Sequence, residues 1–196
     1  MTGVESSAWD EAVAAGACPI VAWSSEVWRC HIRRYPGDDA GGSLRATGRY
    51  NRGSDRFPIE ATWPALYTAL AQHIALGERL RHTTPAALSR LSEQRISRLS
   101  VRLHIVLDCC AAPDCIEPAV PGLTQADICR PGDYRATHSF ASAARLRGVE
   151  GLLIPSCTRF RGGNLIIFPD LLRLESNVAL TDSEDPDLIV DWDSVS

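Results

Sequence analysis

Residues 148–156 read GVEGLLIPS and residues 164–172 read NLIIFPDLL, and these two apolar runs decide the fold. Each run has the length of a β-strand, and residues 157–163 between them, CTRFRGG, carry the glycine and arginine that are typical of a loop. Apolar runs bounded in this way are typical of buried strands. We therefore predict two central strands of one sheet, joined by a short loop.

Further strands and helices are predicted on the N-terminal side of these runs. Strand character is found in residues 27–32 (VWRCHI), 63–69 (WPALYTA) and 96–108 (ISRLSVRLHIVLD). Helical spacing and helix-start residues predict helices from Ala69 to His82, from Pro85 to Ser97 and from Thr137 to Arg147. The expected fold class is α+β, a single domain with a strongly bent, mixed central sheet and flanking helices.

The domain organisation follows from length and composition. A chain of 196 residues that is 45% hydrophobic can bury one sizeable core, so we expect one compact unit. Residues 1–26 are expected to form an N-terminal extension, residues 27–175 the domain, and residues 176–196 an acidic, solvated C-terminal tail. Residues 36–56 and the proline-rich residues 111–133 are predicted to be irregular.

The charge pattern excludes several classes of function. All 20 basic residues are arginine, so lysine nucleophiles and Schiff bases are excluded. A formal net charge of −4 argues against tracking along nucleic acid, whereas arginine suits bidentate capture of a small phosphate or carboxylate ligand. The sequence shows neither a membrane-length apolar run nor a secretory signal, so we expect a cytoplasmic protein that does not bind a membrane. Its seven cysteines need no disulfide framework, so we expect reduced thiols.

The strongest local cluster of polar residues is TGRYNRGS, residues 47–54. Gly48 and Gly53 allow the backbone to approach a ligand closely, and Arg49 and Arg52 present guanidinium groups that match phosphate oxygens. The pattern favours a site for a diphosphate, although a solvated turn has the same composition.

Several motifs together resemble the RES domain family. Gly48-Arg49-Tyr50-Asn51 is similar to the first family motif, Leu66-Tyr67-Thr68-Ala69 to the second, and Glu78 follows at a family-like interval. The segments 27–29, 148–156 and 164–168 are similar to further parts of the family pattern, so the resemblance covers most of residues 27–172. Cys157 departs from the pattern, because alanine is usual after the serine equivalent to Ser156.

The resemblance implies a fold related to the ADP-ribosyltransferases and an NAD-consuming toxin that is neutralised by an Xre-like helix-turn-helix antitoxin. Within this interpretation, Glu78 stabilises the positive charge that develops on the ribose as nicotinamide leaves. Tyr67 stacks on the nicotinamide ring, and Arg49 clamps the pyrophosphate. The catalytic candidates are therefore Glu78, Arg49 and Tyr67, and the candidates for NAD binding are Arg29, Arg49, Tyr50, Asn51, Tyr67 and Ser156.

The chemistry leaves alternatives open. The preferred reaction is hydrolysis or phosphorolysis of NAD, with ADP-ribosyl transfer to another molecule, or binding of NAD or ADP-ribose without turnover, as alternatives. Zinc binding by Cys109, Cys110, Cys115 and Cys129 is disfavoured because no CxxC pair is present, and no metal is expected. His138 is a candidate for a position near the ligand, and the composition is also compatible with a homo-oligomer.

Overall fold

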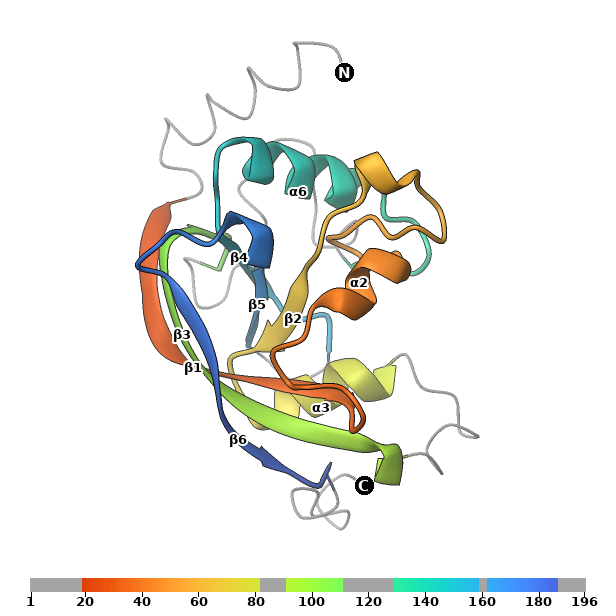
Figure 1. The fold of residues 1–196 in the computed structure, drawn as a ribbon, viewed down its shortest axis with the longest axis vertical. Coiled ribbons are helices and arrows are strands. Elements are labelled where there is room, and N and C mark those ends of the chain that lie inside the picture. Colours follow the sequence, from red (N-terminus) through yellow and green to blue (C-terminus); the bar gives the residue numbers. More distant parts are fainter. Residues whose placement is uncertain (1–18, 82–90, 111–128, 159–161, 187–196) are drawn as a thin grey trace.

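Five β-strands close into a ring in the computed structural model, which describes residues 19–81, 91–110, 129–158 and 162–186 (Figure 1). The strands are β1 (Ile20–Ile32), β2 (Leu66–Ala69), β3 (Gln94–Asp108), β4 (Gly151–Pro155), β5 (Gly163–Ile167) and β6 (Asn177–Glu184). Their order is β1-β2-β5-β4-β3, and β3 pairs back with β1. The fold is thus α+β in a single domain, and the bent sheet that was predicted is closed like a barrel.

The pairing of β3 explains how the ring closes. One edge of β3 pairs with β1 along almost its whole length, from the Ile20–Leu107 pair to the Ile32–Gln94 pair. The other edge pairs with β6 over its first half and with β4 at its last three residues. The β3–β4 pair is parallel and the other described pairs are antiparallel, so the sheet is mixed, as predicted.

The central strands β4 and β5 are buried on both faces, which accounts for their continuous apolar sequences. Leu153, Leu165 and Ile167 pack inside the ring, in a cluster to which all five of its strands contribute. Residues of opposite parity face outward and pack beneath the helix α6 (Arg135–Leu146), whose buried face includes Phe140. Side chains alternate between the two faces of a strand, so Asn164, the polar residue of these two strands, also lies on this outer face.

A buried carboxylate fastens the start of β4 to the rest of the fold. Glu150 is fully buried, and its two oxygens accept hydrogen bonds from the backbone N–H groups of His104, Ile105 and Arg173 and from the Ser176 hydroxyl. Burial alone would raise the pKa of Glu150, but these donors lower it below its ordinary value. The glutamate of GVEG therefore connects β3, β4 and the segment before β6.

The remaining helices are short. The helix α3 (Gln72–Arg81) follows β2, and α2 (Gly41–Arg45) lies in the region predicted to be irregular. Single 3-10 turns are formed by Ile59–Ala61, Leu91–Glu93 and Pro169–Leu171. No helix in the described ranges is long and apolar enough to cross a membrane.

The predicted helix Pro85–Ser97 and the bounds of the expected extension and tail differ from the structure, whereas the helices around residues 69–82 and 137–147 are found as α3 and α6. The predicted helix Pro85–Ser97 is wrong from Gln94 onward, because residues 94–97 belong to β3, and residues 82–90 lie outside the described ranges. Ser97 is fully buried and pairs with Arg29 of β1, so pairing with a long neighbouring strand outweighs the helix-start signal. In the expected tail, residues 177–184 form β6, and β1 begins at Ile20, within the expected extension.

Candidate functional site

The Gly48–Asn51 loop is fixed by the side chain of Tyr67, which comes from β2. The Tyr67 hydroxyl accepts a hydrogen bond from the backbone N–H of Tyr50 at 2.7 Å and donates one to Oδ1 of Asn51 at 2.9 Å. The amide nitrogen of Asn51 donates in turn to the carbonyl oxygens of Ser43 and Ala46 in and after α2. The loop is therefore held in one conformation before any ligand arrives.

Gly48 is required because the same side chains leave no room at this position. A Cβ atom at Gly48 would overlap Oδ1 of Asn51 and lie 2.6 Å from the Tyr67 hydroxyl. Nε2 of His138, from α6, donates to the carbonyl oxygen of Gly48 at 2.8 Å. Burial lowers the pKa of His138, so a neutral imidazole that is protonated on Nε2 fits this contact at neutral pH. His138 thus adds a second contact that holds the loop.

A pocket of about 460 Å³ opens on the outer face of β2, β4 and β5. Tyr67, Ile154, Asn164 and Ile166 contribute to its floor, and cross-strand pairing places Asn164 beside Ile154 and Ile166 opposite Tyr67. Its remaining lining comes from β1 (Trp28, Arg29, Cys30), the loop before β2 (Thr47, Gly48, Arg49, Tyr50), β2 (Thr68, Ala69), α3 (Ala75, Glu78, Arg79) and the residues Tyr134, Pro155 and Cys157.

Glu78 is the acidic side chain of this pocket, and its position is fixed by three donors. Its Oε1 atom accepts hydrogen bonds from the Ser156 hydroxyl at 2.7 Å, the Asn164 amide at 2.8 Å and the backbone N–H of Cys157 at 3.0 Å. In the described part of the chain Oε2 accepts no hydrogen bond, so this oxygen is available to a ligand. Glu78 lies one helical turn after Ile74, so it faces the sheet.

Three arginines, Arg29, Arg49 and Arg79, line the same pocket as this carboxylate. Nη1 of Arg29 donates to the carbonyl oxygens of Gly37 at 2.9 Å and Asp39 at 2.7 Å, which holds its guanidinium group in place. Burial lowers the pKa of Arg29 to about 10, with the nearby acidic groups opposing this effect, so the side chain stays charged at neutral pH. Arg49 lies over the ring of Tyr134, at 5.2 Å from the ring centroid, and donates to the carbonyl oxygen of Arg130.

The structure brings most of the predicted site residues to this one pocket. Arg29, Arg49, Tyr50, Tyr67 and Glu78 line it. The two remaining candidates, Asn51 and Ser156, are buried beside the pocket, where Asn51 bonds to the loop and Ser156 bonds to Glu78.

Several lining residues were not among the predicted site residues, and the polar ones include Arg79, Tyr134, Cys157 and Asn164. Asn164 carries a signal that could have revealed it. It is a polar residue with the same strand parity as Ile166, and thus faces outward from an otherwise apolar run. Tyr134 and Cys157 reach the pocket through tertiary contacts that no local pattern indicates.

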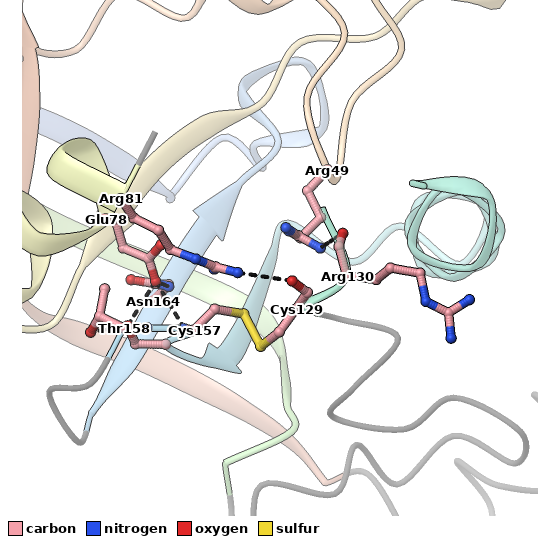
Figure 2. Close-up of a disulfide and its surroundings, with 9 residues drawn as sticks. Arg49, Glu78, Arg81, Cys129, Arg130, Cys157, Thr158 and Asn164 are labelled. Carbon is pink, nitrogen blue, oxygen red and sulfur yellow. Dashed lines mark hydrogen bonds between the residues drawn. A yellow bond between two sulfur atoms is a disulfide. The ribbon is translucent and has the colours of Figure 1, made fainter. Parts of the chain in front are cut away.

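A disulfide bond joins Cys129 and Cys157 at the edge of the pocket (Figure 2). The expectation that all thiols are reduced is therefore wrong for this pair. Cys30, Cys109 and Cys110 are not disulfide-bonded, and Cys115, one of the cysteines weighed as a zinc ligand, lies outside the described ranges.

The fold and the pocket define a single-domain α+β protein with a candidate site lined by one fixed carboxylate and several arginines. The family model of the RES domain matches residues 26–193, so the chain belongs to the RES domain family. A search of curated proteins finds no match. Among solved structures, the chain is similar to one in the crystal structure of the M. tuberculosis MbcT-MbcA toxin-antitoxin complex, with a TM-score of 0.72 and 22% sequence identity, covering 92% of this chain and 91% of that one. At this identity the likeness concerns the fold.

Proposed function

We propose that this protein binds NAD in the pocket and cleaves the bond between nicotinamide and ribose. The observation that carries the proposal is the geometry of Glu78, whose Oε1 is held by Ser156, Cys157 and Asn164 while Oε2 is available. Departure of nicotinamide leaves positive charge on the ribose, and a carboxylate that is already oriented stabilises this charge without reorganising. Membership in the RES domain family supports an NAD-related activity.

The basic residues of the pocket suit the diphosphate of NAD. Arg29, Arg49 and Arg79 line the same pocket as Glu78, in a protein whose overall charge is −4. Arg29 uses Nη1 to bind the loop carbonyls, which leaves its Nη2 atom for a phosphate oxygen. Arg49 is held over Tyr134 and clamps the second phosphate in this proposal.

The neighbouring polar residues divide into contact and positioning roles. The Tyr67 hydroxyl is engaged by Tyr50 and Asn51, so the ring face of Tyr67 is the part that stacks on nicotinamide. Ser156 is 5% exposed and bonds to Glu78, which favours orientation of the carboxylate over contact with the ribose. Asn51 acts by holding the loop that carries Arg49 and Tyr50.

Two acceptors fit the proposed reaction. With water, the products are nicotinamide and ADP-ribose, and with phosphate the anomeric carbon carries the phosphate group instead. A macromolecular acceptor, as in the ADP-ribosyltransferases whose fold the family resembles, is the alternative within the enzyme class. A binding module without turnover is the alternative outside it.

The decisive test measures free nicotinamide after incubation of the purified protein with NAD, with and without phosphate. We expect the variant Glu78→Gln to bind NAD and to lose about a hundredfold or more in turnover, because the amide keeps the size of the side chain but not its charge. Glu175→Gln, at an exposed position, is the matched control and should behave as wild type. Equal turnover by wild type and Glu78→Gln would refute the assignment.

We also propose that the protein is a toxin that is neutralised by an Xre-like helix-turn-helix antitoxin. Support comes from the RES domain and from the fold that it shares with a chain of the MbcT-MbcA toxin-antitoxin complex. Expression of the wild-type chain alone should then arrest growth, and Glu78→Gln should relieve the arrest. Growth arrest of the same degree by both proteins would show that toxicity does not depend on NAD cleavage.

A further inference from the structure

The Cys129–Cys157 disulfide joins two segments that each hold a charged group of the pocket (Figure 2). On one side, the backbone N–H of Cys157 donates to Oε1 of Glu78 at 3.0 Å. On the other side, the residue after Cys129 is Arg130, whose carbonyl oxygen accepts a hydrogen bond from Nη1 of Arg49 at 3.2 Å. The disulfide therefore links the carboxylate side of the pocket to the guanidinium side.

The two cysteines belong to segments that the sheet does not hold together. Cys157 follows the last residue of β4, Pro155, by two positions, and Cys129 precedes α6, which begins at Arg135. The carbonyl oxygen of Cys129 accepts a hydrogen bond from Nη2 of Arg81 at 2.8 Å, but this bond and the Arg49–Arg130 bond are exposed to solvent. Exposed bonds of this kind contribute little to stability, and the disulfide adds a covalent link between the two segments.

We propose that this disulfide is a redox switch that controls the assembly of the pocket. In the oxidised protein the segment 156–158 is held against Glu78, and Arg130 is held against Arg49. Reduction removes the covalent restraint from both segments, so the donor from Cys157 to Glu78 and the partner of Arg49 are held less firmly. The activity part of this inference rests on the proposed function, whereas the assembly part does not.

The chemistry of the switch is thiol–disulfide exchange with a dithiol reductant of the thioredoxin class. One thiolate of the reductant attacks a sulfur of the bridge, a mixed disulfide forms, and the second thiol of the reductant releases it. One S–S bond of the protein is broken, Cys129 and Cys157 become thiols, and the reductant becomes a disulfide. Reoxidation is the reverse exchange with a disulfide oxidant such as oxidised glutathione.

Both states can be prepared from the full chain, with oxidised glutathione or with dithiothreitol, followed by removal of the reagent. Mass spectrometry of unreduced peptides should find Cys129 linked to Cys157 in the oxidised sample. Hydrogen exchange should then be about tenfold faster at the amides of residues 157 and 158 after reduction. If reduction leaves about one molecule in ten with the pocket assembled, the KM for NAD should also rise about tenfold.

The variants separate this bridge from the other thiols. Cys129→Ser and Cys157→Ser should show the hydrogen exchange and the NAD turnover of reduced wild type, whether they are treated with oxidised glutathione or with dithiothreitol. Cys110→Ser should keep the full redox response, because its thiol is not disulfide-bonded. Reduced wild type has the native sequence, so the comparison does not depend on the folding of a variant.

The outcomes distinguish the redox proposal from the proposed function. The redox proposal is refuted if Cys129→Ser retains the slow hydrogen exchange of the oxidised wild type. It is also refuted if Cys129→Ser responds to the reductant as wild type does. If no sample releases nicotinamide, the proposed function fails, and the hydrogen exchange of residues 157 and 158 alone decides whether the bridge orders the pocket.

Discussion

Replacing Asn164 with aspartate tests whether Glu78 works as a negatively charged group in the position where the structure holds it. The amide nitrogen of Asn164 lies 2.8 Å from Oε1 of Glu78. In Asn164→Asp this donor becomes a second carboxylate. Two unit charges about 4 Å apart repel each other by about 4 kcal/mol at an effective dielectric constant of about 20.

Protonation of one carboxyl group relieves this repulsion, so the variant should be active only when the pair has taken up a proton. The repulsion strengthens proton binding to the pair by about three orders of magnitude. Once protonated, the introduced carboxyl group can donate to Glu78 and so replaces the lost amide. The turnover of Asn164→Asp, divided by that of wild type, should therefore rise as the pH falls from 8 to 6, by up to about tenfold per pH unit for a single proton.

The assay is nicotinamide release from NAD at a series of pH values, and Asn164→Leu is the matched control. Leucine has a similar size and removes the donor without adding charge, so its turnover should be lower by a constant factor. The loss of one hydrogen bond to a charged group is about 1.5–3 kcal/mol, or about ten- to a hundredfold in rate. A ratio for Asn164→Asp that does not change between pH 6 and 8 would refute the idea that Asn164 acts through the charge of Glu78.

Two further substitutions test the frame of the site. Gly48→Ala places a Cβ 2.6 Å from the Tyr67 hydroxyl, so it should destabilise the fold by about 1–3 kcal/mol and weaken NAD binding. Gly42→Ala is the control, because a Cβ there meets nothing within 4 Å. Urea unfolding should show a loss of stability for Gly48→Ala and none for Gly42→Ala. Glu150→Gln replaces an acceptor oxygen with a donor that faces two donors, so it should cost about 3–6 kcal/mol of stability. Because the pKa of Glu150 is lowered in the folded protein, the wild type should lose this stabilisation as the pH falls through that pKa. Thermal melts of wild type and Glu150→Gln at a series of pH values measure this loss. A parallel loss of stability in the two proteins would contradict this role of Glu150.

The central strands could be predicted from sequence because each run carries its own signal. Residues 148–156 and 164–172 contain β4 and most of β5, which pair with each other as neighbours. The closure of the ring could not be predicted in the same way. It depends on the register between β1 and β3 and on one pair between β1 and β2, Trp28 with Ala69, and both are tertiary features.

The site shows the same division between local and tertiary information. The motif GRYN and the positions of Tyr67 and Glu78 point to groups that do line one pocket. The sequence does not distinguish the role of Arg49 from that of Asn51. Arg49 lines the pocket, whereas the side chain of Asn51 bonds to Tyr67 and to the backbone near α2. The difference lies in hydrogen-bond partners that are distant in the chain.

The distribution of charge in the pocket supports the proposed ligand, a dinucleotide with a cationic base. The charged side chains of the lining are three arginines and Glu78, and Glu78 comes from the middle of α3, where Ser156, Cys157 and Asn164 hold one of its oxygens. A diphosphate alone would be repelled by this carboxylate, and a cation alone would be repelled by the arginines. NAD carries both charges on one molecule, so under the proposed function the carboxylate selects the pyridinium end while the guanidinium groups select the phosphates. In the proposed reaction the positive charge passes to the ribose as the nicotinamide bond breaks, and the same carboxylate then stabilises the group that is reacting.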